Sequence, residues 1–161
     1  RDGHLIALGA PHELYLYPPD GYTARFLGQM NIVACTIQRC TATGMVLART
    51  PLGLIHARMG DLRLAAEQRA ELMIRPEHIA LCVDGAADLP NVVQGVITGV
   101  LFAGRVVEYT IRVATTELHV HALSTTALTE GSVVRLHLPA ERCWVLPAES
   151  ADASPEETVA S

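Results

Sequence analysis

Two histidines, His119 and His121, stand one residue apart in a run of alternating apolar and polar side chains. On a β-strand both imidazoles would point to the same face, where they could in principle hold a metal ion. Such a site needs further ligands, and His137 and Cys143 fall on other predicted strands. We therefore favour the plainer interpretation, a polar face of an amphipathic strand, and predict no metal site.

The run Ile74-Arg75-Pro76-Glu77 is the sharpest local signal in the strand-rich region of the sequence. Arg75 and Glu77 are two residues apart and would project to the same side, while Pro76 lacks a backbone donor and marks the end or the edge of a strand. We expect Arg75 and Glu77 to form an ion pair between domains or subunits. The alternative is a local salt bridge to a neighbouring loop, which contributes only about 0–1 kcal/mol when exposed.

A glycine pair, Gly99 and Gly104, precedes a strongly strand-like segment that contains Glu108. A turn with positive φ at Gly104 is the expected explanation, and a glycine-rich anion cradle is the less favoured one. The carboxylates of Glu13, Glu77 and Glu108 are too dispersed for paired acid–base chemistry, and no Ser/His/Asp or Cys/His arrangement has local motif support. We predict no catalytic residues and no enzyme in this chain.

The composition excludes several classes of function. The 161 residues carry a formal charge of −5, only 4% are aromatic, and all twelve basic residues are Arg, scattered singly. Nucleic acid is a poor partner, because phosphate neutralisation needs clustered cations and single strands need stacking rings. The absence of Lys removes a phosphate-loop lysine. The four cysteines lack C-x-x-C spacing and indicate a reduced compartment, and no apolar run approaches the ~20 residues of a membrane span.

Proline, glycine and capping residues, together with the period of the apolar residues, predict the helices and strands. Pro11 suits the first turn of a short helix, Pro18 and Pro19 end it, Asp20 can cap a second helix, and Gly28 can end that helix. A short strand is expected over residues 3–8. From Asn31 the period becomes two, which predicts ten strands over 32–38, 45–49, 54–58, 70–75, 78–83, 92–101, 105–114, 117–122, 132–138 and 142–146.

These strands form two copies of one unit. Asn31-Ile32-Val33 aligns with Asn91-Val92-Val93, and the segment from Ile74 to Glu77 aligns loosely with Leu138 to Glu141, at an offset of about 60 residues. Five strands is the count of an oligonucleotide/oligosaccharide-binding (OB) barrel. We therefore predict a mostly β fold: tandem five-stranded OB-like barrel units, over about 31–84 and 91–147, behind a short N-terminal helical segment. Residues 148–161 are rich in Ala, Ser, Glu and Thr and are expected to be disordered.

Three motifs together resemble a known family. The stretch from Gly9 to Tyr15, with Pro18 and the run from Ala24 to Asn31, resembles the G-x-P-x-E-[IL]-Y…P…[AV]-x-F-[IL]-G-x-x-N junction at the end of the ATPase domain of ABC importer subunits. The Arg75-Pro76-Glu77 run resembles the [IL]-R-P-E motif of the regulatory domain that follows. The Phe102-Ala103-Gly104 run with Glu108 resembles the second half of that domain, the transport-associated OB (TOBE) region of polyamine, ferric iron, maltose and sulfate importers.

The resemblance implies that residues 1–28 are the C-terminal remnant of an ATPase domain and that 29–147 are its regulatory companion. It implies a homodimer through the β domain, transporter membrane subunits as partners of the full-length protein, and a cytoplasmic place beside the cell membrane without direct insertion. Arg75, Pro76, Glu77, Gly104 and Glu108 become candidate regulatory or interface residues. The chain lacks a G-x-x-x-x-G-K-[ST] loop and an LSGGQ-like signature, so ATP and Mg²⁺ are expected only in an ATPase domain upstream.

An alternative function stays open. Related β domains bind molybdate, and the chain could be a module for a small oxyanion or a feedback solute, with Ser124, Thr125 and Thr126 as candidate donors. The same three residues would equally make an ordinary turn.

Overall fold

A computed structural model of the chain describes residues 11–60, 64–82, 89–123 and 128–148. The strand expected over residues 3–8 and nearly all of the C-terminal tail fall outside this part. Two short helices begin it, α1 (Pro11–Leu16) and α2 (Gly21–Phe26). As the sequence predicts, Asp20 caps α2, with its Oδ1 accepting a hydrogen bond of 2.6 Å from the Thr23 amide. Gly28 then turns the chain with a φ of 134°.

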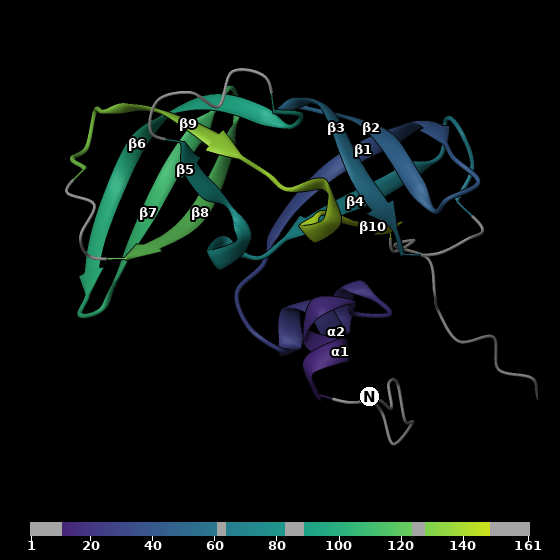
Figure 1. The fold of residues 1–161 in the computed structure, drawn as a ribbon, viewed down its shortest axis with the longest axis horizontal. Helices are drawn as coiled ribbons and strands as arrows, with labels where there is room; N and C mark the ends of the chain where they lie inside the picture. The colour runs from purple at the N-terminus through teal and green to yellow at the C-terminus, as the bar shows by residue number, and fades with distance from the viewer. Residues whose placement is uncertain (1–10, 61–63, 83–88, 124–127, 149–161) are drawn as a thin grey trace, which may run out of the picture.

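All ten predicted strands are present, in two five-stranded units that lie side by side (Figure 1). The first unit is a closed barrel in the order β1-β2-β3-β10-β4. Its strands are β1 (Asn31–Cys40), β2 (Met45–Thr50), β3 (Gly53–Met59), β4 (Arg69–Ile74) and β10 (Trp144–Pro147). Four of its five pairings are antiparallel, and β10 runs parallel to β3.

The second unit is an antiparallel sheet in the order β5-β9-β6-β7-β8. Its strands are β5 (Ala80–Cys82), β6 (Val92–Ala103), β7 (Val106–Val113), β8 (Thr116–Leu123) and β9 (Val133–His137). Two 3₁₀ helices, η1 (Pro76–His78) and η3 (Ala140–Arg142), precede β5 and β10 respectively. They occupy the two segments that the sequence aligns as repeats.

The two units exchange their last strands. The chain leaves the first unit after β4 and places β5 against β9 of the second sheet, and it leaves β9 to insert β10 between β3 and β4 of the barrel. The mostly β architecture is confirmed, but each unit is completed by a strand from the other copy instead of by five consecutive strands. Neither copy is therefore complete without the other.

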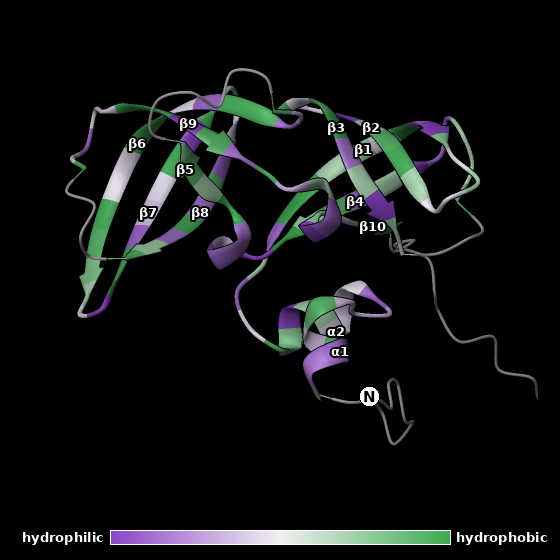
Figure 2. Ribbon diagram, viewed as in Figure 1, coloured by the Kyte–Doolittle hydropathy of each residue, from purple (hydrophilic) through white to green (hydrophobic). Residues whose placement is uncertain are grey.

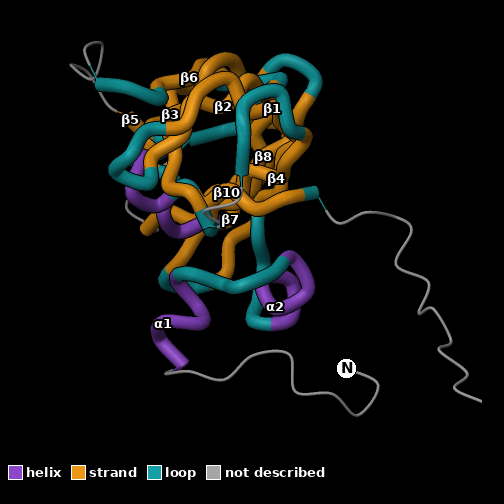
Figure 3. Tube along the Cα trace, turned by 90° about the vertical axis from the view of Figure 1, so that its right-hand side faces the viewer, coloured by secondary structure: helices purple, strands orange, loops and turns teal. Residues whose placement is uncertain are grey.

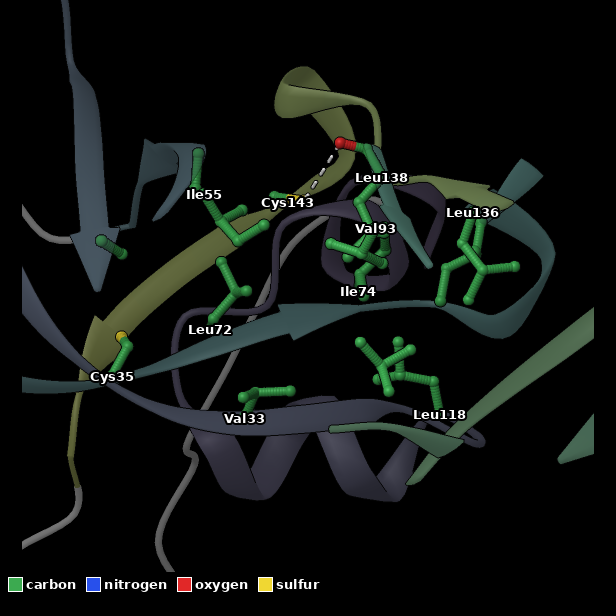
Figure 4. Packing of buried hydrophobic residues seen from close by; sticks show 14 of the residues in the cluster. Val33, Cys35, Ile55, Leu72, Ile74, Val93, Leu118, Leu136, Leu138 and Cys143 are labelled. Carbon is green, nitrogen blue, oxygen red and sulfur yellow. Dashed lines mark hydrogen bonds between the residues drawn. The ribbon is translucent and has the colours of Figure 1, made fainter. Parts of the chain in front are cut away.

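The core runs through both units without a break. Strand residues alternate between buried and exposed, as period-two patterning requires. Figure 4 shows the inward residues meeting between the units: Val33, Ile55, Leu72 and Ile74 from the barrel, and Val93, Leu118, Leu136 and Leu138 from the second unit, all less than 10% exposed. Figure 2 shows these strands as alternating hydrophobic and hydrophilic bands.

Candidate functional site

The helical segment packs against the outside of the barrel, below the junction of the two units (Figures 1 and 3). Trp144 of β10 donates from Nε1 to the Pro18 carbonyl oxygen at 3.0 Å, and its ring lies 5.1 Å from that of Tyr17. Ala24 of α2, fully buried, packs with Met73 and Leu146 in a small second core. The segment is thus held by apolar burial as well as by hydrogen bonds.

Arg75 fastens the segment at the junction. Its side chain is 2% exposed, and its guanidinium reaches two backbone carbonyls, from Nη1 to Gln29 at 3.2 Å and from Nη2 to Tyr15 at 3.1 Å. The Tyr15 ring lies under the same guanidinium, with Cζ 3.8 Å from the ring centroid. Burial lowers the pKa of Arg75, but an arginine remains charged, so its cation needs these partners.

Glu77 holds the other end of the same tyrosine. The Tyr15 hydroxyl donates to Glu77 Oε1 at 2.5 Å, a short charge-assisted hydrogen bond. This bond, with partial burial, raises the pKa of Tyr15. Burial alone would raise the pKa of Glu77, yet the Tyr15 hydroxyl, its own backbone amide and the nearby cations bring it below the ordinary value. We call Tyr15, Arg75 and Glu77 the Tyr15 clasp.

The clasp differs from the expected ion pair. Within the described residues no salt bridge joins Arg75 to Glu77; both side chains grip one aromatic residue instead. Pro76 lies where its missing donor predicts, with one residue between it and the end of β4, at the start of η1. The ion pair that does link helix to barrel is Arg25 with Glu71, at 3.5 Å and partly exposed. The sequence patterns did not predict Tyr15 as the shared partner of Arg75 and Glu77, although the motifs that contain these three residues were both identified.

Two asparagines tie the units together. Asn31, at the start of β1, donates to the His119 carbonyl at 2.8 Å and accepts from the His119 amide at 2.7 Å. Asn91, in the equivalent place before β6, bonds the amide and the carbonyl of His56 at 2.8 and 2.7 Å. Each side-chain amide thus makes with one strand residue the pair of hydrogen bonds that a neighbouring strand would otherwise make with it. The sequence aligned these asparagines as repeats but gave no hint of their partners.

The other two candidate residues, Gly104 and Glu108, lie in the β6–β7 hairpin. Gly104 is at its tip with a φ of 75° and open space around it, which confirms the turn. Glu108 lies on the outer face of β7, between Leu101 of β6 and His121 of β8 in register. Leu101 and Leu123 are 62% and 66% exposed on that face. Figure 2 shows the end of β6 as hydrophobic.

The structure describes the metal candidates but not the oxyanion candidates. His119 and His121 share the outer face of β8, and within the described residues no group of three or more His, Cys, Asp or Glu could hold a metal ion. The candidate donors Ser124, Thr125 and Thr126 lie outside the described part. No helix in that part is long and apolar enough to cross a membrane.

Comparison with known proteins defines the class. The family model of the TOBE domain matches residues 72–146. In the solved structures, the fold is similar to that of the cytoplasmic molybdate-binding protein ModG with molybdate bound, with a TM-score of 0.63 over 73% of this chain and 96% of that one. Their sequence identity is 14%, so this likeness concerns the fold alone. Residues 72–146 are therefore a TOBE domain, and the two β units together have an OB-like fold.

Relatives of known function indicate which group of TOBE-containing proteins the chain resembles. The chain is 33% identical over 143 residues to the Fe(3+) ions import ATP-binding protein FbpC of Serratia marcescens, and 26% identical over 152 residues to the putrescine transport ATP-binding protein PotG of Escherichia coli. The matches cover 86% and 89% of this chain but only 37% and 40% of those proteins. The chain belongs to the TOBE regions of importer ATP-binding proteins, a non-catalytic domain and not the ATPase.

Proposed function

We propose that this chain is the regulatory and dimerisation region of the ATP-binding subunit of an ABC importer, in a protein longer than itself. The relatives support this, since each is an ATP-binding protein of which the chain spans about 40% or less. ATP and Mg²⁺ would be held by an ATPase domain elsewhere in that protein. Its other partners would be the membrane subunits of the transporter, on the cytoplasmic side.

The observation that carries the proposal is the Tyr15 clasp. The motif that resembles the end of an ATPase domain supplies Tyr15, and the motif that resembles the regulatory domain supplies Arg75 and Glu77. The two motifs contact each other directly. A displacement of the helical segment would shift η1, because η1 contains Glu77 of the clasp. η1 itself packs on β8 of the second unit. The clasp therefore gives a mechanical route between an ATPase domain and both β units.

The second unit offers a surface for a second copy. Leu101 and Leu123 are exposed on the outer face of the sheet, and Glu108 and Val106 lie between their strands. Contiguous exposed apolar residues mark interaction sites more often than scattered ones do. A two-fold dimer would bury this patch against itself, and it would raise the effective concentration of two attached ATPase domains.

Light scattering on the purified chain tests the dimer. The proposal expects a mass of twice 17.3 kDa, or 34.6 kDa, at high concentration. Leu101→Asp should shift the mass to that of the monomer, because it places a charge in the patch. Leu54→Asp is the matched control, since Leu54 is 52% exposed on β3 of the other unit. A monomeric wild-type chain, or equal dissociation by both variants, would overturn this part of the proposal.

A further inference from the structure

The buried side chain of Arg75 has a donor that it does not use. Its Nη1 and Nη2 atoms bond the carbonyl oxygens of Gln29 and Tyr15, but Nε, which is also buried, has no partner among the described residues. Within the same residues no carboxylate forms a salt bridge with this cation. Buried polar atoms in folded proteins are nearly always hydrogen-bonded, so an unpaired donor calls for an explanation.

The second junction between the two β units forms without such an arginine. Pro139 precedes η3 as Arg75 precedes η1, with φ and ψ of −54° and 127° against −70° and 144°. Each 3₁₀ helix carries a glutamate in its first turn, Glu77 in η1 and Glu141 in η3. Because the same turn forms with a proline in place of the arginine, the junction itself does not require Arg75. The arginine instead serves the contact that distinguishes η1, which is the one with Tyr15.

Glu77 lies near the unused donor but is held by another group. Its Oε1 accepts from the Tyr15 hydroxyl at 2.5 Å, while the ring of the same tyrosine lies 3.8 Å from Cζ of Arg75. Burial would raise the pKa of Glu77, but the Tyr15 hydroxyl and the charges nearby, that of Arg75 among them, lower it. The carboxylate and the guanidinium thus contact one phenol at different points, and the Tyr15 hydroxyl binds the oxygen that could otherwise accept from Nε.

We propose that the Glu77 carboxylate has two positions, on the Tyr15 hydroxyl when the helical segment is docked and on Nε of Arg75 when Tyr15 withdraws. The inference rests on the proposed function, because it supplies the two arrangements through which an attached ATPase domain would act on the β units. Withdrawal of Tyr15 removes the ring and a carbonyl from Arg75, and it releases Glu77 at the same time.

Both positions leave the charges of the junction satisfied. A cation at a buried position is costly without partners, and after withdrawal Arg75 would keep only the Gln29 carbonyl. A carboxylate on Nε replaces the lost contacts with a charge-assisted hydrogen bond. The segment from Arg75 to Glu77 can therefore exchange one set of partners for another, which is the property that a two-state element needs.

The Nε–Hε resonance of Arg75, measured by NMR on the full chain, reports the second position directly. Tyr15→Phe removes the hydroxyl and keeps the ring, so it releases Glu77 while the helical segment stays docked. We expect a downfield shift of Hε relative to wild type and exchange with solvent about tenfold slower, as for a donor that gains a charged acceptor. Adding Glu77→Ala to Tyr15→Phe should abolish both changes.

Glu141→Ala is the matched control, because Glu141 is an exposed glutamate at the equivalent place in η3. Added to Tyr15→Phe, it should leave the Hε shift in place. In urea unfolding of the Tyr15→Phe chain, Glu77→Ala should raise the unfolding equilibrium constant about tenfold and Glu141→Ala about twofold or less.

An Hε resonance that is the same in wild type and Tyr15→Phe would overturn the proposal, and so would a shift that survives Glu77→Ala. Equal effects of Glu77→Ala and Glu141→Ala on unfolding would overturn it as well. All of these measurements use the chain without an ATPase domain. Their failure would therefore remove the second position of Glu77 and leave the proposed regulatory role standing, whereas failure of that role would not change the Hε resonance.

Discussion

The guanidinium of Arg75 lies over the ring of Tyr15, sixty residues earlier in the chain, with Cζ 3.8 Å from the ring centroid. The ring is also tethered at its hydroxyl by Glu77. A single aromatic side chain therefore connects the helical segment to the point where the chain crosses from the barrel to the second unit. The stability of the fold, and the proposed coupling between the helical segment and the two β units, should both depend on Tyr15.

Tyr15→Phe keeps the ring under Arg75 but removes the hydrogen bond to Glu77. We expect a loss of about 0.5–1.5 kcal/mol in the free energy of unfolding, since the bond is exposed to solvent. Tyr15→Leu should cost about 1–2 kcal/mol more, because it also removes the cation–π contact over a buried arginine. Urea unfolding followed by Trp144 fluorescence measures both, as Trp144 contacts Pro18 and Tyr17. Equal stability of the two variants would show that the ring contact contributes nothing.

Asn91 should be the more sensitive of the two asparagines. It makes a third hydrogen bond, to the Leu138 carbonyl at 2.9 Å, and its φ is 59°. Asn91→Ala should cost about 2–4 kcal/mol, from three lost bonds and the left-handed backbone. Asn91→Gly accepts that backbone, so the difference between the two variants measures the strain. Calorimetric melting would refute this account if Asn31→Ala, which loses two bonds, destabilised the protein more.

Gly95 is required by a close approach of strands. A Cβ there would lie 2.7 Å from Ile111 Cγ2 and 2.8 Å from the Arg112 carbonyl oxygen. Gly95→Ala should therefore lower stability by about 1–3 kcal/mol. Gly99→Ala on the same strand is the control, because its Cβ would meet only Thr110 side-chain atoms at 3.5 Å. Chemical denaturation should place the control within about 1 kcal/mol of wild type; the reverse order would contradict the packing described.

Burial raises the pKa of Cys143 to about 12 and that of Cys35 to about 11, against an ordinary value of 9.0. Well below pH 9 both thiols are neutral in the folded and the unfolded chain, so they cause no pH dependence there. As pH rises above 9, only the unfolded chain ionises, and stability should fall. Cys143→Ala should flatten this alkaline slope in melting experiments between about pH 8 and 10. An unchanged slope would mean that neither burial nor this thiol governs it.

The local structure was predictable because it depends on neighbours in sequence. Period two placed all ten strands, Asp20 and Gly28 marked the limits of α2, and Pro76 marked the end of β4. The repeat also aligned, loosely, the two segments in which the structure has η1 and η3. Each of these signals acts over a few residues, or repeats a pattern already present.

The long-range pairings were not predictable from the same patterns. β5 and β10 have the same apolar character whichever unit receives them, so alternation cannot report the exchange. The partners of Arg75 were missed for a similar reason. The two terminal nitrogens of this buried arginine donate to carbonyls and its guanidinium lies over an aromatic ring, whereas its Nε has no partner among the described residues. The opposite charges suggested that Arg75 pairs with Glu77, whereas in the fold both side chains contact Tyr15.

We propose that this region regulates an ATPase through the Tyr15 clasp, and ATP hydrolysis by the longer importer-type protein that the proposed function implies tests this claim most directly. Turnover should be compared between wild type, Tyr15→Phe and the surface control Arg112→Gln, with ATP affinity measured alongside. We predict a several-fold change in turnover for Tyr15→Phe alone, with ATP affinity unchanged. Unaltered turnover in Tyr15→Phe, or a longer protein that does not hydrolyse ATP, would contradict the claim.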